Sequence, residues 1–65
     1  MNLTINGNPI TIKPCTIFDY ISDQNFPIEN LVVEHNQTII PQSDWQHVLL
    51  QEGDQLEILC FVGGG

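Results

Sequence analysis

The sequence predicts an α+β fold in which a mixed sheet of about five strands carries one main helix on one face. Three observations lead to this prediction. Short apolar runs that alternate with polar residues recur along the chain, with turn residues between them. One helical pattern, with a capping residue at its start, stands between the second and third of these runs. The last run, residues 55–62, is the longest and most apolar, so we expect it inside the sheet.

The length of 65 residues allows one domain at most. A domain of this size buries only about 60% of the surface that its unfolded chain exposes. We expect a folded domain over residues 1–62 and a flexible glycine tail over residues 63–65. The apolar runs are shorter than the ~20 residues of a membrane span. The first residues show neither a basic region nor a cleavage-site pattern, so we expect a cytoplasmic protein without a secretory signal.

Negative charge is the strongest bias of the composition. Lys13 is the only Lys or Arg against eight Asp and Glu, and the formal net charge is −7. Phosphate backbones and anionic membrane surfaces both attract clustered Lys and Arg, so we expect neither nucleic acid nor a membrane as a partner. The acidity indicates either a basic protein partner, met with electrostatic steering, or a contribution to solubility alone.

The first two strands are predicted to form a hairpin. Leu3 and Ile5 alternate with polar residues, and so do Ile10 and Ile12. Residues 6–9 (Asn-Gly-Asn-Pro) lie between them and are typical of a tight turn. Either pairing Ile5 with Ile10, or a register shifted by two, keeps all four apolar residues on one face. The proline cannot donate to a strand ladder, so the second strand is expected at an edge.

One helix is predicted to begin at Thr16. Asp19 follows three residues later, which completes a short capping box and places a negative charge at the positive end of the helix. Ile17, Tyr20 and Ile21 fall at helical spacing, with Phe18 beside them. The Asn-Phe-Pro sequence that follows ends the helix by about residue 24.

The second half of the chain is predicted to hold three strands and a helical turn. Residues 31–35 form the third strand, residues 36–37 a tight turn, and residues 38–40 a fourth strand that a proline stops. A brief helical turn begins at Ser43 and Asp44, and Gly53 marks a turn before the last strand. The helical turn packs three apolar side chains against the sheet: Trp45, Val48 and Leu49.

The last strand has two different faces. One face, which we assign to the core beneath the helix, carries Leu56, Ile58, Cys60 and Val62. The other face begins polar and ends with Leu59 and Phe61. We interpret Leu59 and Phe61 as an exposed apolar spot for partner binding beside the tail; the alternative is that loop residues cover them. The order of two strands, a helix, two strands, a short helical turn and a strand is the arrangement of the β-grasp, or ubiquitin-like, roll.

Three glycines close the printed sequence: Gly63, Gly64 and Gly65. A glycine run is costly to order and buries no side chain, so it does not serve the fold. Three extended residues reach about 10 Å, enough to carry a carboxylate into a partner's pocket. A carboxylate becomes an acyl donor only after activation, and the sequence has no glycine-rich phosphate-binding loop ending in lysine. We therefore interpret Gly65 as the reactive group, activated by another protein.

No catalytic or metal-binding pattern is present in the sequence. Cys15 and Cys60 are too few for a disulfide framework and are expected to be thiols. Cys60 lies near the reactive end, where a sulfur relay is conceivable, but an inert strand residue is the preferred interpretation. His35 and His47 lack cysteine or carboxylate neighbours at ligand spacing, so we expect no metal site. No Ser-His-Asp or Cys-His arrangement stands out, so no catalytic residue is proposed.

An ordered set of short segments resembles the ThiS family of sulfur carriers in thiamine biosynthesis. The segments are residues 33–36 (Val-Glu-His-Asn), 39–41 (Ile-Ile-Pro), Trp45, 52–58 (Glu-Gly-Asp-Gln-Leu-Glu-Ile) and 61–65 (Phe-Val-Gly-Gly-Gly). They span the C-terminal half with close spacing, and the N-terminal half agrees in layout.

The resemblance implies that an E1-like enzyme adenylates the Gly65 carboxylate and consumes ATP, with no cofactor bound to the carrier itself. Sulfur from cysteine, delivered as a persulfide by a cysteine desulfurase, would then displace AMP and leave a C-terminal thiocarboxylate. Thiazole synthase would receive this sulfur. Gly63 and Gly64 would extend the tail into the partner. The carrier would thus be a co-substrate, not an enzyme.

Other functions fit parts of the sequence. The small subunit of molybdopterin synthase also ends in Gly-Gly, but such chains are usually longer, and carriers for other sulfur-transfer pathways stay open. A non-reactive ubiquitin-like interaction module would tolerate loss of Gly64 and Gly65. A plant-type ferredoxin needs four cysteines for its cluster, and two are present, which excludes it.

Overall fold

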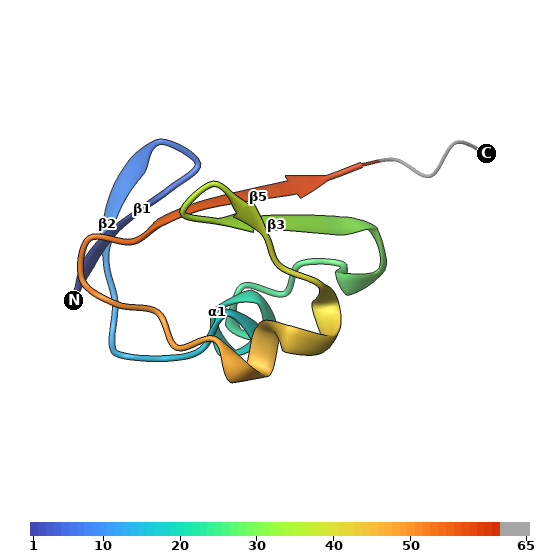
Figure 1. Ribbon diagram of the computed structural model, residues 1–65, viewed down its shortest axis with the longest axis horizontal. Coiled ribbons are helices and arrows are strands. Elements are labelled where there is room, and N and C mark those ends of the chain that lie inside the picture. Colours follow the sequence, from blue (N-terminus) through green and yellow to red (C-terminus); the bar gives the residue numbers. More distant parts are fainter. Residues whose placement is uncertain (62–65) are drawn as a thin grey trace.

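The fold is one five-stranded sheet with the helices against one face (Figure 1). A computed structural model describes residues 1–61. Its elements in chain order are β1 (Asn2–Ile5), β2 (Asn8–Thr11), α1 (Ile17–Asp23), η1 (Ile28–Asn30), β3 (Leu31–His35), β4 (Thr38–Ile39), η2 (Gln42–His47) and β5 (Gln55–Cys60). None of the helices within these residues is long and apolar enough to cross a membrane.

The last strand is the centre of the sheet, as predicted. The strand order is β2-β1-β5-β3-β4. β5 runs parallel to β1 and antiparallel to β3, so the sheet is mixed. α1 and η2 lie on the same side of it (Figure 1). This arrangement confirms the β-grasp roll. The predicted boundary at residue 62 and the tail over residues 63–65 lie outside the described residues.

The β1–β2 hairpin adopts the register shifted by two. Leu3 lies opposite Ile10, not Ile12. Asn6 and Gly7 have φ angles of 52° and 81°, the positive values that a two-residue hairpin turn requires, and this short turn sets the register. β2 lies at the edge of the sheet, where the missing N–H of Pro9 breaks no ladder.

Helix α1 begins as the sequence predicts. The Asp19 amide donates to Oγ1 of Thr16 at 3.1 Å, and the Thr16 amide donates to Oδ2 of Asp19 at 3.2 Å. These reciprocal bonds satisfy two amides that the helix itself leaves without acceptors. Ile17 and Ile21 then turn toward the sheet and are almost fully buried.

The core lies between the sheet and the helices α1 and η2. Its buried side chains are Leu3, Ile5, Ile17, Ile21, Val33, Trp45, Leu50, Leu56 and Ile58. Trp45 is the largest of them, and its indole Nε1 donates to the carbonyl of Ile40 at 2.9 Å. This bond satisfies the only polar atom that the indole brings into the core.

The prediction that Leu49 packs against the sheet is wrong. Leu49 is 55% exposed, and Leu50 is buried in its place. The reason is that η2 ends at His47 and the chain then becomes extended. The Ile17 amide donates to the Val48 carbonyl, and the Leu50 amide donates to the Cys15 carbonyl. In extended backbone alternate side chains face opposite ways, so Leu49 points outward.

The assignment of Cys60 to the core is also wrong, because Cys60 is exposed. Leu56 and Ile58, on the same face of β5, are buried as predicted, and Val62 lies outside the described residues. β1 pairs with β5 only at Gln55 and Leu56. Beyond Ile58 the strand therefore has a neighbour on the β3 side alone, and a residue there has less protein around it.

Candidate functional site

The backbone that leads to the glycines is hydrogen-bonded to the sheet as far as Phe61. The antiparallel ladder between β3 and β5 runs from His35 opposite Leu56 to Leu31 opposite Cys60. One residue further, the Phe61 amide donates to the Asn30 carbonyl at 3.0 Å. The sheet thus fixes the chain up to the start of the last four residues. Gly63, Gly64 and Gly65 lie outside the residues that the structure describes.

The other side of β5 is held by an asparagine side chain. The Ile58 amide donates to Oδ1 of Asn6 at 2.7 Å, and Nδ2 of Asn6 donates back to the Ile58 carbonyl at 3.2 Å. Asn6 has left the strand conformation to enter the β1–β2 turn, so its side-chain amide takes the place of the next backbone peptide. β5 is therefore bonded on both sides as far as Ile58. The sequence pattern had indicated only a turn at Asn6.

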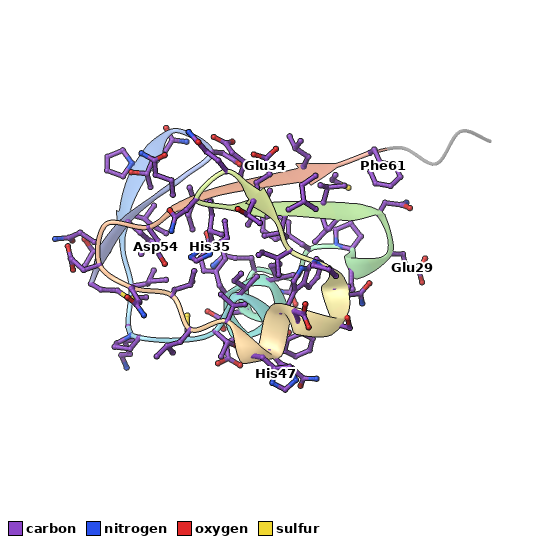
Figure 2. All side chains as sticks on the ribbon, in the orientation of Figure 1. Glu29, Glu34, His35, His47, Asp54 and Phe61 are labelled. Carbon is purple, nitrogen blue, oxygen red and sulfur yellow. The ribbon has the colours of Figure 1, made fainter. Side chains whose placement is uncertain are left out.

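Leu59 and Phe61 are exposed, as predicted from the alternation along the last strand. They are 55% and 52% accessible, and Figure 2 shows Phe61 at the end of β5. No loop covers them among residues 1–61. Val32 lies directly opposite Leu59 and adds a partly buried apolar neighbour. The role of Leu59 and Phe61 in partner binding stays a prediction.

A polar cluster that no sequence pattern predicted lies at the start of β5. Nε2 of His35 is 2.7 Å from Oδ2 of Asp54 (Figure 2). The same Oδ2 accepts the Gln51 amide at 2.8 Å, and Oδ1 accepts Nδ2 of Asn36 at 3.1 Å. Oδ1 of Asn36 accepts the Gln55 amide at 2.9 Å. The cluster joins the β3–β4 turn to the turn before β5.

The pKa of Asp54 reflects this environment. Burial alone raises it, but the hydrogen bonds from His35, the Gln51 amide and Asn36 lower it by more, and the pKa lies below its ordinary value. The sequence held a signal for this cluster, since residues 33–36 and 52–58 both carry the resemblance. Spacing could not reveal it because the two segments are distant in the chain.

Cys15 lies at an open pocket of about 390 Å³ between the β2–α1 loop and the helix. Lys13, Asp19 and Asp23 also line this pocket. Burial raises the pKa of the Cys15 thiol, and the negative charges of Asp19 and Asp23 raise it further. A thiol in such surroundings stays protonated and is a weak nucleophile.

Potential metal ligands do not gather in the part of the chain that is described. Residues 1–61 contain no group of three or more His, Cys, Asp or Glu side chains placed to hold an ion. His35 is engaged with Asp54, and Figure 2 shows His47 on the helical side, away from both.

A mixed sheet with its last strand at the centre and one main helix across it defines a β-grasp protein, and in this sequence three glycines follow soon after that strand. The family model of ThiS matches residues 3–65, and the chain belongs to the ThiS family.

Solved and curated relatives agree with this assignment. The crystal structure of the thiamine biosynthesis protein ThiS from Geobacter metallireducens superposes with a TM-score of 0.86 at 30% identity, and the match covers 100% of both chains. The sulfur carrier protein ThiS of Bacillus subtilis is 34% identical over 65 residues, which are 97% of this chain and 98% of that protein.

A second group of relatives is much longer. The thiazole synthase of Magnetococcus marinus is 32% identical over 66 residues. The match covers 100% of this chain but 20% of the synthase, so the chain spans about a fifth of that relative's length. The thiazole synthase of Paramagnetospirillum magneticum gives the same proportions at 33% identity.

Proposed function

We propose that the chain is a sulfur carrier that delivers sulfur for thiazole formation in thiamine biosynthesis, with the carboxylate of Gly65 as the group that is loaded. The observation that carries this proposal is the match to the sulfur carrier of B. subtilis, which extends over nearly the whole of both chains. The family match includes the three glycines.

The proposed chemistry starts with adenylation. A carboxylate resists nucleophiles because it is negatively charged and lacks a good leaving group. An E1-like enzyme transfers AMP from ATP to a Gly65 oxygen and releases pyrophosphate. The terminal sulfur of a persulfide, which a cysteine desulfurase forms from cysteine, then attacks the acyl carbon, and AMP leaves. A thiol cleaves the resulting acyl disulfide, is itself oxidised to a disulfide, and leaves the thiocarboxylate on Gly65.

The chain itself acts in this scheme as a co-substrate. Its contribution is to hold the end of β5 in place, through the β3 ladder and the Asn6 side chain, so that partners meet the tail at a defined position. A docked carrier raises the effective concentration of its reactive group at the partner's site. Cys15 is poorly suited to relay sulfur because the pKa of its thiol is raised.

Thiazole synthase is the proposed acceptor. Two relatives named thiazole synthase contain a segment similar to the whole of this chain. When one polypeptide joins two segments, both are present together and at high local concentration. This arrangement in relatives supports a direct transfer from the carrier to the synthase.

Intact-mass spectrometry tests the loading step. The purified chain is incubated with the E1-like enzyme, ATP, a cysteine desulfurase, cysteine and a thiol reductant. We expect a species heavier by the difference between one sulfur and one oxygen atom, and fragmentation should place it on Gly65. A chain that lacks Gly65 should not gain this mass, and neither should the full chain without ATP. An unchanged mass under full conditions, or equal loading of the shortened chain, would contradict the proposal.

A further inference from the structure

The face of the sheet opposite the helices carries two carboxylates next to apolar side chains. Glu34 on β3 lies directly opposite Glu57 on β5, and Val32 lies directly opposite Leu59 in the next outward-facing pair. Ile39 on β4 is the other neighbour of Glu34 and is 63% exposed. We call Val32, Glu34, Ile39, Glu57 and Leu59 the outer-face patch.

The direction of these side chains follows from the alternation along each strand. Val33, Leu56 and Ile58 are buried beneath the helices. Their direct neighbours along each strand therefore point to the opposite side of the sheet. Figure 2 shows Glu34 on the side of the sheet away from the helices and its neighbour His35 on the helical side. Glu57 is exposed and Glu34 is partly exposed.

The opposed carboxylates of Glu34 and Glu57 destabilise the sheet locally. Like charges directly opposite each other on neighbouring strands repel and destabilise the sheet. The chain offers no nearby cation, because Lys13 is its only Lys or Arg and lines the pocket beside α1. Within residues 1–61 the one contact between a carboxylate and a basic side chain is that of Asp54 with His35, which lies on the helical side of the sheet.

We propose that the outer-face patch docks onto the adenylating enzyme at a surface that combines an apolar contact with an arginine or lysine. The apolar contact meets Val32, Ile39 and Leu59, and the cationic side chain lies between Glu34 and Glu57. This inference rests on the proposed function and adds to it the residues that select the partner.

Charge complementarity identifies the occupant. Cβ atoms of directly opposite residues in an antiparallel pair are about 4.5–5.5 Å apart, so one guanidinium can contact both carboxylates. Arginine is suited to this because its planar fork carries five N–H donors. A partner cation would relieve the repulsion that the free carrier keeps. The net charge of −7 would in addition speed the encounter with a basic surface.

The test measures how tightly the carrier binds the E1-like enzyme of its own source organism. The variants are Glu34→Gln, Glu57→Gln and the double variant, which keep side-chain size and remove charge. Asp44→Asn is the matched control, because it removes the same charge from η2 on the helical side. Association and dissociation rates are recorded at low and high salt, and urea unfolding of each free carrier is recorded in parallel.

We expect the double variant to bind about 10-fold more weakly at low salt, chiefly through slower association, and the difference to shrink at high salt. The Asp44→Asn control should stay within about 2-fold of the wild type. The urea midpoint of the free double variant should be equal to or higher than that of the wild type, because the repulsion is gone. A purely structural role would lower affinity and midpoint together.

Two failures are distinguishable. If the wild type binds and acquires sulfur but the double variant binds equally well, or no worse than Asp44→Asn, the inference is wrong and the proposed function stands. A loss of affinity that follows a lowered urea midpoint also overturns the inference. If the wild type neither binds the enzyme nor is adenylated, the proposed function fails, and the assigned partner fails with it.

Discussion

Nε2 of His35 lies 2.7 Å from Oδ2 of Asp54, and this contact joins the end of β3 to the turn that begins β5. The two residues are 19 positions apart in the chain. Asp54 accepts three hydrogen bonds in all and is the one buried charged residue within the described part of the molecule. The Asp54 carboxylate therefore holds the start of β5, the strand that leads to the glycines, in a defined position.

Replacing this carboxylate should destabilise the domain. Asp54→Ala leaves the His35 ring, the Gln51 amide and the Asn36 side chain without their acceptor. We expect the free energy of unfolding to fall by about 2–3 kcal/mol, measured by urea denaturation at neutral pH. Asp23→Ala, which removes an exposed carboxylate at the end of α1, should change it by less than about 0.5 kcal/mol. Equal losses of unfolding free energy in the two variants would show that the hydrogen bonds to Asp54 do not stabilise the domain.

The same carboxylate should make stability depend on pH in the acidic range. The pKa of Asp54 is lowered in the folded protein, so the ionised form favours folding. Its contribution is complete above the ordinary value of 3.8 and is lost as the pH falls from there through the lowered pKa. We expect the stability difference between the wild type and Asp54→Asn to shrink over this window. Urea unfolding across a pH series measures it, and a difference that stays constant would contradict the assignment.

Replacing Asn6 should lower the free energy of unfolding by more than replacing an ordinary turn residue does. Asn6→Ala removes both bonds to Ile58 and leaves the amide and carbonyl of a buried strand residue without partners. We expect a loss of at least about 2 kcal/mol, to which the strain of Ala at a φ of 52° contributes, and faster hydrogen exchange at the Ile58 amide as the specific sign of the lost bonds. Asn8→Ala is the control, since Asn8 is exposed and its side chain makes no hydrogen bond within residues 1–61. If exchange at Ile58 is unchanged in Asn6→Ala, the side chain does not replace a strand peptide.

Leu59 and Leu49 form a matched pair for the docking prediction. Both are 55% exposed, but Leu59 lies on β5 beside the tail and Leu49 lies on the helical side. Leu59→Asp should weaken binding to the adenylating enzyme at least about 10-fold, because it places a charge where an apolar contact is proposed. Leu49→Asp should bind as the wild type does. Titration calorimetry measures both, and circular dichroism confirms that each variant is folded.

Phe61→Asp tests the same contact one step nearer to the tail. Phe61 is 52% exposed, so the substitution should leave the fold intact while it weakens binding to the same enzyme. If Phe61→Asp unfolds the domain, or binds normally, the assignment of Phe61 as an exposed partner-binding residue is wrong.

Local signals predicted the elements of this fold well. The capping bonds between Thr16 and Asp19 span three residues, and the sequence alone located them. The Asn-Gly turn after β1 and the glycine turn before β5 were found in the same way, because backbone conformation at such positions depends on the residue itself. The alternation along β5 predicted that Leu56 and Ile58 are buried and that Leu59 is exposed.

Burial and side-chain contacts that depend on residues distant in the chain were decided only by the three-dimensional arrangement. Cys60 shares a face with Leu56, yet it is exposed because β1 ends before it. The bonds from Asn6 to Ile58 cross 52 positions, and no local pattern marks them. The same holds for His35 with Asp54 and for the opposed pair of Glu34 and Glu57. The sequence determined which segments become strands and helix, because those preferences act over a few residues. Only the folded sheet decided which side chains meet, because strand order and register bring together residues that the chain keeps apart.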